Sequence, residues 1–479
     1  MAGVMQELRT KVVATAGPAT ASREKITEIL RAGANVIRIN FAHGTAPDHR
    51  QTVAWVRAAA AELDVPVAIL GDLAGPKIRV GDLSEPLELT ADETVVIAPE
   101  EDALEDEIPC TYPGRADDVG PDDRLLLDDG LLELRVESVA APRVTARVVR
   151  GGTLLPYKGL NLPGIQVSAP ALTEKDRVDL ELAAELGFDY IGLSFVQRPE
   201  DVIALRELIL DKQLIVAKIE KGVAVERIGE ILEVTDAVMV ARGDLGVELP
   251  FEQVPVVQKR IIQRANMYGR PVITATQMLE SMIEQSRPTR AEASDVANAL
   301  FDGTDAVMLS GETAVGKNPV AAVDAMVRIA REIEQTASFV EGPKYDVPMH
   351  NWLRAGATRT EHAIAAATVE AVNLLGAPAI ITLTRSGFTS RVVSSYRPPV
   401  PILGVCHDER VHRQLALVWG VRPVLCDPER MHDYDDVMAC SLRAVLELGL
   451  GQHGDRVVVT AGVPFAVSGT TNMLRVEEL

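Results

Sequence analysis

Eight short apolar runs that end in polar residues constrain the fold of this 479-residue chain more than any other feature. Most of the runs follow amphipathic segments such as "SREKITEILRAG" and "TEKDRVDLELAAELG", the second of which opens with a Thr173-x-x-Asp176 capping box. Continuous apolar strands that alternate with helices are typical of a parallel sheet covered on both faces. The runs cover residues 11–19, 35–44, 66–75, 189–197, 214–222, 237–246, 271–277 and 306–313.

Eight such units predict an α/β fold built on a (β/α)8 barrel, whose active site lies at the C-terminal ends of the strands. The polar residues of this sequence gather at that end of each run, which favours the barrel over the alternative, an open doubly wound sheet. These strand-end residues are Arg38, Asn40, Asp72, Ser194, Lys218, Glu220, Arg242, Asp244, Thr276, Ser310 and Glu312.

The chain is too long for one hydrophobic core, since single cores stop growing at about 250–300 residues. Short alternating runs replace the strand–helix rhythm between the third and fourth units, which predicts a small all-β domain inserted in a βα loop. That position, at the catalytic face, suits a lid. The predicted domains are the barrel (1–76 and 169–345), a β-barrel lid (77–168) and a C-terminal α/β domain (346–479).

The net charge of −21 argues against a nucleic-acid partner or an anionic membrane partner, because both would be repelled. An anionic substrate must therefore be attracted by a local cluster of cations. The sequence has no apolar run of 18 residues and no signal-peptide pattern, so we expect a cytoplasmic protein without a membrane span. Its four cysteines have neither metal-ligand nor C-x-x-C spacing and are expected to be free thiols: Cys110, Cys406, Cys426 and Cys440.

Lys218 and Glu220 lie two residues apart in "VAKIEKG", so both side chains point to the same face of a strand. Asp244, in "VMVARGDLGVELP", would add a second carboxylate from a neighbouring strand end. Two carboxylates together with substrate oxygens are a site for Mg²⁺, and Lys218 beside the ion could stabilise an oxyanion or an enolate.

Further strand-end groups suit an anionic substrate. Arg38 is a bidentate phosphate donor, and the N–H groups at Gly243 and Asp244 open a short helical turn that could hold a carboxylate. Thr276 adds a hydroxyl at the neighbouring strand end. The residues alone thus predict a Mg²⁺-dependent barrel enzyme that acts on a phosphorylated or enolisable carboxylate.

The chain also resembles a known family over essentially its whole length. The motifs are "NVIRINFAHGT", "GPKIR", "KGLNLPG", "VAKIEKG", "VMVARGDLGVELP", "PVITATQMLESM", "SRPTRAEASDVANA" and "VMLSGETAVGK". Together they are similar to pyruvate kinases, and the resemblance extends from "KVVATAGPAT" to the closing "GTTNMLRV". It implies phosphoryl transfer from phosphoenolpyruvate to ADP, giving pyruvate and ATP, with a mobile lid and a C-terminal regulatory domain.

The resemblance also implies roles for individual residues. Glu220 and Asp244 would hold the divalent ion, Mg²⁺ or Mn²⁺, while Lys218 would stabilise the transferring phosphoryl group and the enolate. Arg38 would grip the phosphate, and the carboxylate would lie at Gly243, Asp244 and Thr276. The nucleotide phosphates would meet Arg79, Lys158, His43 and Asn40.

Most pyruvate kinases bind K⁺ beside the substrate phosphate, through an Asn, a Ser, an Asp and a backbone carbonyl, with a Glu nearby. Asn40, Asp72 and the Leu73 carbonyl match this pattern here. Ala42 replaces the Ser and Lys77 replaces the Glu. Since an ammonium group repels K⁺ by about 4 kcal/mol at 4 Å and an effective dielectric of 20, we expect Lys77 to replace the ion. Its ammonium would hydrogen-bond to Asp72 and to the incoming phosphate.

The stretch "TLTRSGFTSR" of the C-terminal domain resembles the loop that binds phosphorylated effectors in this family. Hydroxyls and N–H groups at a helix start form a phosphate cradle, although the same groups also serve as ordinary N-caps. Phe388 stands where some members have Arg, which argues against fructose bisphosphate as the effector. The family is typically homotetrameric, and we expect the same here. The cradle residues are Thr384, Arg385, Ser386, Gly387 and Thr389.

Two other functions stay open from the residues alone. A barrel lyase or aldolase would use Lys218 as a Schiff base, although Glu220 nearby opposes this by favouring the charged amine. A catalytically inactive sensor would use only the C-terminal domain, although the intact carboxylate pair argues against it.

Overall fold

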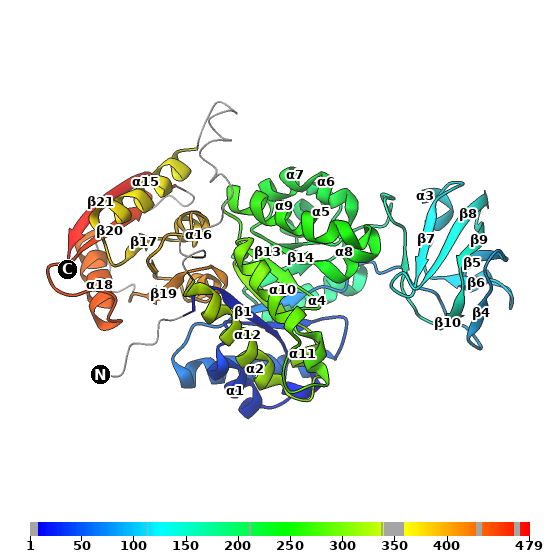
Figure 1. The fold of residues 1–479 in the computed structure, drawn as a ribbon, viewed down its shortest axis with the longest axis horizontal. Helices are drawn as coiled ribbons and strands as arrows, with labels where there is room; N and C mark the ends of the chain where they lie inside the picture. Colours follow the sequence, from blue (N-terminus) through cyan, green and yellow to red (C-terminus); the bar gives the residue numbers. More distant parts are fainter. Residues whose placement is uncertain are drawn as a thin grey trace.

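The chain forms three units that lie in a row along the long axis of the molecule (Figure 1). A (β/α)8 barrel occupies the middle, with an all-β unit at one end and an α/β unit at the other. The computed structural model describes residues 8–112, 114–209, 212–336, 339, 359–427, 434–463 and 470–479. The predicted domain boundary at residues 345 and 346 lies outside these residues.

The barrel closes in the hydrogen-bonded order β1-β16-β15-β14-β13-β12-β3-β2, with every neighbouring pair parallel. The predicted (β/α)8 fold is confirmed, and the open sheet is excluded. All eight strands come from the predicted apolar runs: β1 (Lys11–Thr15), β2 (Val36–Asn40), β3 (Ala68–Asp72), β12 (Tyr190–Leu193), β13 (Leu214–Ile219), β14 (Ala237–Ala241), β15 (Val272–Ala275) and β16 (Ala306–Leu309).

Helices cover the outside of the barrel, and inward-pointing strand side chains fill its interior, so the apolar strands are buried on both faces. Local signals fix their ends. The helix α4 begins at the predicted capping box, where Thr173 and Asp176 exchange hydrogen bonds of 2.8 and 3.1 Å. The main helices are α1 (Arg23–Ala32), α2 (Ala46–Leu63), α4 (Glu174–Glu185), α5 (Pro199–Arg206), α7 (Ile228–Val234), α9 (Val254–Met267), α10 (Arg290–Phe301) and α12 (Pro319–Glu334). None of the described helices combines the length and apolar character needed to span a bilayer.

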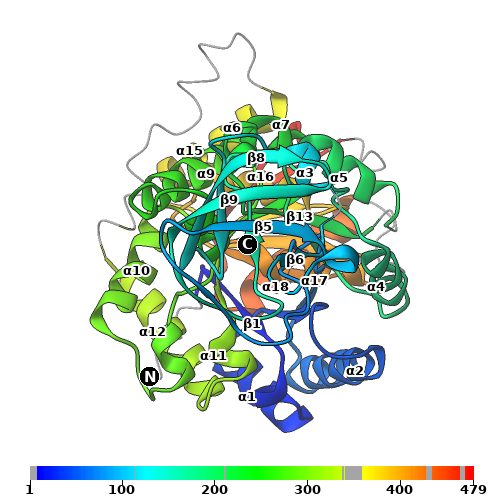
Figure 2. The same ribbon diagram turned by 90° about the vertical axis from the view of Figure 1, so that its right-hand side faces the viewer.

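The all-β unit lies between β3 and β12 in the sequence and is called the lid below. Its larger sheet has the order β11-β7-β8-β9-β5-β6, and a second sheet pairs β10 with β4. Figure 2 views the molecule from the lid, with β5, β8 and β9 in front. Bridges from Arg79 to Gly159 and from Val80 to Cys110 connect the two edges of the larger sheet. The strands are β4 (Leu87–Leu89), β5 (Thr94–Pro99), β6 (Ile108–Cys110), β7 (Arg124–Leu127), β8 (Leu132–Ala140), β9 (Arg143–Arg150), β10 (Gly152–Leu154) and β11 (Leu160–Asn161).

The C-terminal unit has a mixed sheet in the order β19-β18-β17-β20-β21, with β21 antiparallel to its neighbour. Cys426 and Cys440 form a disulfide, so the expectation of four free thiols is wrong for this pair; Cys110 and Cys406 are buried and lie outside this disulfide. The elements are β17 (Ile380–Leu383), β18 (Ile402–Cys406), β19 (Val421–Leu425), β20 (Arg456–Ala461), β21 (Met473–Glu478), α15 (Thr360–Leu375), α16 (Phe388–Ser395), α17 (Glu409–Gln414) and α18 (Tyr434–Glu447).

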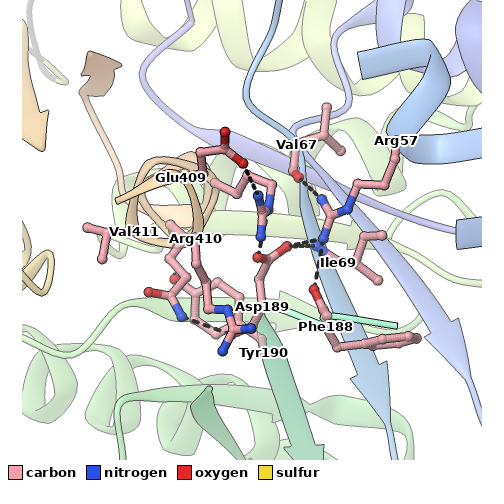
Figure 3. A network of polar contacts seen from close by, with 12 residues as sticks. Arg57, Val67, Ile69, Phe188, Asp189, Tyr190, Glu409, Arg410 and Val411 are labelled. Atoms are coloured by element: carbon pink, nitrogen blue, oxygen red, sulfur yellow. Dashed lines mark hydrogen bonds and ion pairs between the residues drawn. The ribbon is translucent and has the colours of Figure 1, made fainter. Parts of the chain in front are cut away.

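The C-terminal unit contacts the N-terminal ends of the barrel strands, opposite the lid. Asp189, directly before β12, is fully buried and accepts hydrogen bonds from the Ile69 N–H, from Arg57 and from Arg413 of α17. Figure 3 shows Asp189 facing Arg57, with the helix that carries Glu409 and Arg410 alongside. Asp305, before β16, is bonded in the same way to Arg397. Because each carboxylate is hydrogen-bonded to both units, these contacts fix the C-terminal unit away from the catalytic face.

Candidate active site

Lys218 occupies the centre of the strand-end cluster. It lies near the end of β13, and its ammonium is 2.8 Å from Glu220 Oε1, 3.3 Å from Asp72 Oδ1 and 2.7 Å from Ser194 Oγ. The side chain is only 13% exposed. Three neighbouring strands, β3, β12 and β13, therefore deliver the groups that surround one buried cation.

Asp72 joins this cation to a second one. Its Oδ2 accepts hydrogen bonds from Arg38, with distances of 2.6 Å to Nη2 and 2.7 Å to Nε. Burial alone would raise the pKa of Asp72, but the charges of Lys218 and Arg38 outweigh it and hold the pKa below its usual value. The buried strand thus ends on an anion that holds two cations at the strand ends.

The ammonium group of Lys218 stays charged. Burial acts to lower the pKa of Lys218, but the carboxylates of Asp72 and Glu220 raise it well above the ordinary value. A Schiff-base lysine needs the neutral amine. The environment of Lys218 therefore opposes the lyase or aldolase alternative and suits a group that stabilises negative charge.

Glu220 lies beside this lysine, and the Asp244 carboxylate is close enough to Glu220 to act on its charge. Glu220 is 1% exposed, and its Oε2 accepts the N–H of Phe195 at 2.7 Å. Burial and the charge of Asp244 raise the pKa of Glu220, while Lys218 opposes the shift. Within the described part of the chain, no group of three or more His, Cys, Asp and Glu side chains is placed to hold a metal. Two carboxylates completed by substrate oxygens fit the way Mg²⁺ is usually held.

Thr276 and Gly243 lie together at the ends of β15 and β14. Gly243 lies in the first turn of α8 (Arg242–Glu248) and donates its N–H to Thr276 Oγ1 at 2.8 Å. Thr276 and Gln277 adopt positive φ angles of 68° and 53°, and Phe195 has a φ of 56°. Non-glycine residues with positive φ are strained and gather at functional sites, which supports this location.

The side chains of two strand-end residues, Arg242 and Glu312, bind the neighbouring loops instead. Arg242 binds Asp295 at 2.6 Å and donates to the Thr276 carbonyl at 2.6 Å. Glu312 accepts the N–H groups of Leu279 and Ser310 at 3.0 and 2.7 Å. These contacts hold the loops that follow β15 and β16.

Residues 7–323 match the family description "Pyruvate kinase, barrel domain", and residues 362–477 match "Pyruvate kinase, alpha/beta domain". This chain belongs to the pyruvate kinase family. The pyruvate kinase of Clostridium acetobutylicum is 43% identical over 476 residues, covering 98% of this chain and 99% of the relative. The Corynebacterium glutamicum enzyme is 44% identical over 477 residues, covering 98% of each chain. The Geobacillus stearothermophilus enzyme is 44% identical over 476 residues, covering 98% of this chain and 80% of the relative.

The basic residues assigned to the nucleotide by resemblance to pyruvate kinases lie on the lid. Arg79 donates to the Tyr157 carbonyl at 3.0 Å, and Lys158 forms a 2.9 Å ion pair with Asp128. On the barrel side, His43 is exposed and donates its N–H to the Asn40 carbonyl at 3.2 Å. The two pairs therefore belong to different units.

Lys77 does not bind Asp72 as the sequence predicted. Within the described residues, the cations bonded to Asp72 are Arg38 and Lys218, whereas Lys77 is exposed and lies at the base of the lid. A Cβ at Gly159 would be 3.5 Å from Lys77 Cε, so the side chain extends along the returning lid strand. The Leu73 carbonyl already accepts a 2.7 Å hydrogen bond from Ser194 Oγ.

The predicted effector loop joins β17 to α16, and its groups are partly engaged. Thr389 Oγ1 is 2.9 Å from Thr471 Oγ1, and both residues are buried. The Ser386 carbonyl accepts a 3.1 Å hydrogen bond from Arg391. Gly387 has a φ of 76°, and a Cβ there would meet Arg391 Nη1 at 2.9 Å, so this position favours glycine. Thr384 donates its N–H to the Val405 carbonyl, and Arg385 is exposed.

Two groups that support the site were not predicted from the sequence. Thr15, the last residue of β1, accepts a 3.2 Å hydrogen bond from Arg38 and donates to the Leu309 carbonyl. It could have been found by the same strand-end signal. The Phe195 N–H that binds Glu220 has no side-chain signature, so only the backbone conformation reveals it.

Proposed function

We propose that this chain is a Mg²⁺-dependent pyruvate kinase that transfers phosphate from phosphoenolpyruvate to ADP at the Lys218 cluster. The observation that carries the proposal is the buried Lys218 ammonium, held between Asp72 and Glu220 at the C-terminal ends of neighbouring barrel strands. Phosphoryl transfer depends on positioning and charge stabilisation more than on covalent catalysis, and this cluster is built for both.

Arg38 grips the phosphate of phosphoenolpyruvate, and Asp72 keeps its guanidinium oriented. Lys218 stabilises the negative charge on the phosphoryl group during transfer and on the enolate oxygen that remains. Fixed charges of this kind act strongly in a buried site because they need no reorganisation during the reaction. The substrate carboxylate lies at Gly243, Asp244 and Thr276, opposite the phosphate.

Glu220 and Asp244 would hold the divalent ion, Mg²⁺ or Mn²⁺. When bound, the ion neutralises charge on the substrate oxygens and relieves the repulsion between the two carboxylates. The repulsion adds to the effect of burial in raising the pKa of Glu220. It is the electrostatic reason why these two carboxylates would bind a cation.

Arg79 and Lys158 bring positive charge from the lid to the nucleotide phosphates, and His43 and Asn40 meet the nucleotide from the barrel. Because the two groups belong to different units, ADP is bound completely only when the lid closes. Closure also excludes water from the phosphoryl group.

We assign K⁺ independence to the site on the basis of Ala42 and Lys77. Ala42 removes a hydroxyl ligand, and the Lys77 ammonium repels a monovalent cation within several ångströms. Since Asp72 is bonded to Arg38 and Lys218, Lys77 would act through its charge at the base of the lid, toward the incoming phosphate. Asn40 and the Leu73 carbonyl are the other members of the proposed site at which the Lys77 charge replaces K⁺.

The C-terminal unit would regulate the enzyme through Thr384, Arg385, Ser386, Gly387 and Thr389. A phosphorylated metabolite is the proposed effector, bound by the loop N–H groups and hydroxyls at the start of α16. We further propose a cytoplasmic homotetramer, as is typical of the family, with no nucleic-acid or membrane partner.

A coupled assay tests the catalytic proposal. Pyruvate and ATP should form together from phosphoenolpyruvate and ADP, only when Mg²⁺ or Mn²⁺ is present. Activity that persists after complete chelation of divalent ions would contradict the metal assignment, and the absence of ATP would contradict the kinase activity itself.

A further inference from the structure

The last turn of α8 contacts the lid at two points. A Cβ at Gly130, in the turn after β7, would be 3.8 Å from Val247 Cγ1, so this lid turn lies against the helix. Beside it, Glu248 lies near Asn161, the last residue of β11, and near the Gly164 N–H. The same helix carries Gly243 and Asp244 in its first turn. One short helix thus contacts the substrate site at its start and the lid at its end.

Glu248 is fixed from the barrel side by a buried ion pair. Lys221 Nζ lies 2.6 Å from Glu248 Oε1, with the two side chains 8% and 1% exposed. Lys221 follows Glu220 directly, at the end of β13 and before α6 (Gly222–Glu226). The pair therefore joins the two backbone segments that carry the two proposed metal-binding carboxylates.

The second oxygen of Glu248, Oε2, is not part of the ion pair with Lys221. Oε2 is buried and makes no hydrogen bond within the described residues. Burial raises the pKa of Glu248, and Lys221, the Asn161 side chain and the Gly164 N–H oppose the shift. A buried carboxylate oxygen without a partner is costly, and two lid donors, the Asn161 side chain and the Gly164 N–H, lie near Glu248.

We infer that the last turn of α8 is the surface on which the lid packs. Glu248, held by Lys221, is the positioning residue that fixes the returning lid segment at Asn161 and Gly164. A small rotation of the lid would bring one of these donors into hydrogen-bonding distance of Oε2. Glu248 then favours the closed lid, while its pairing with Lys221 keeps α8 in place.

The surroundings support a pivot at this point. The outgoing chain at Lys77 and the returning chain at Asn161 both line a cavity of about 30 Å³, together with Phe195, Gln197 and Lys221. A space of this size holds a water molecule and leaves room for small rotations. The first turn of α8 stays fixed independently, by the Gly243–Thr276 hydrogen bond and the Arg242–Asp295 ion pair.

This inference rests on the proposed nucleotide site, because closure brings Arg79 and Lys158 to ADP. The central variant is Glu248→Gln, which keeps the shape of the side chain. We expect the KM for ADP to rise about fivefold to tenfold, the effect of replacing a hydrogen bond to a charged acceptor with one to a neutral acceptor, with the KM for phosphoenolpyruvate within about twofold. Asn161→Ala should reproduce this split, and the Asn161→Ala/Glu248→Gln double variant should be no worse than either single variant.

Two further variants separate positioning from stability. Lys221→Met/Glu248→Gln removes the whole ion pair, so thermal stability should recover relative to Lys221→Met while the ADP defect persists. Glu107→Gln, which breaks a lid ion pair with Arg143 away from the pivot, should leave the KM for ADP unchanged.

Three results would overturn the inference. These are a normal KM for ADP in Glu248→Gln, additive effects with Asn161→Ala, and recovery of the KM for ADP in the double variant that removes the ion pair. Failure of the proposed function would look different: the wild-type enzyme would make no ATP, or Arg79→Ala and Lys158→Ala would bind ADP normally.

Discussion

Replacing Lys218 by Met is the perturbation that most sharply separates binding from catalysis. The substitution keeps an unbranched side chain of similar length and removes one buried charge. Asp72 retains its 2.6 Å contact with Arg38, and Glu220 retains the Phe195 N–H, so the phosphate grip and the carboxylate pair stay in place.

The size of the effect follows from these contacts. Loss of one fixed donor at a developing charge typically costs ~10²–10³ in rate, and Lys218 acts on both the transferring phosphoryl group and the enolate oxygen. We therefore expect turnover to be lost, while the KM for phosphoenolpyruvate stays within about tenfold because Arg38 still binds the phosphate. Removing one partner of a buried ion pair also destabilises a protein by about 3–5 kcal/mol, so the fold must be checked.

The assay measures kcat and both KM values in the coupled reaction, with circular dichroism and urea unfolding on the same samples. Lys25→Met is the matched control, since Lys25 forms an exposed ion pair with Glu28 on α1 and should leave all three constants unchanged. A folded Lys218→Met enzyme with near-normal kcat would refute the role of Lys218 in charge stabilisation.

Other predictions address the remaining assignments. The enzyme should be fully active in potassium-free buffer with tetramethylammonium, and Lys77→Glu should create at least a partial K⁺ requirement; a wild-type enzyme that needs millimolar K⁺ contradicts this. Compounds from a panel of sugar phosphates and AMP should change the phosphoenolpyruvate concentration that gives half-saturation, and Ser386→Ala should weaken this response. If no compound has an effect, the assignment of the loop as an effector site is contradicted. Asp72, whose pKa is lowered by Lys218 and Arg38 against burial, contributes stability above its unfolded pKa of about 3.9 that is lost as the pH falls through the lower folded value. Asp72→Asn should therefore flatten the acid branch of unfolding free energy against pH. In denaturant without reductant, thiol titration should find two free thiols, and four would contradict the Cys426–Cys440 disulfide.

The barrel and the centre of its site could be predicted because their signals are local. Several apolar runs end at residues that face the site, and the two-residue spacing of Lys218 and Glu220 places both on one face. The capping box at Thr173 fixes the start of α4 in the same way. These features need no knowledge of distant contacts.

The contacts that were missed or misplaced join segments far apart in the sequence. Asp189 meets Arg413 across 224 residues, and Lys221 meets Glu248 across 27. Within the described residues Arg38 and Lys218 surround Asp72, and the predicted role of Lys77 stays a prediction. Proximity in sequence to Asp72 did not determine where a flexible side chain at the base of the lid would lie.

The most direct test of the account follows the phosphoryl group itself. Phosphoenolpyruvate labelled in its phosphate should be mixed with excess enzyme, ADP and Mg²⁺ in a single turnover, with borohydride added to a parallel sample. We predict that the label appears in the γ-phosphate of ATP in equal amount to the pyruvate formed, and that Lys218 carries no adduct. Label released as inorganic phosphate, or pyruvate trapped covalently on Lys218, would contradict the central claim.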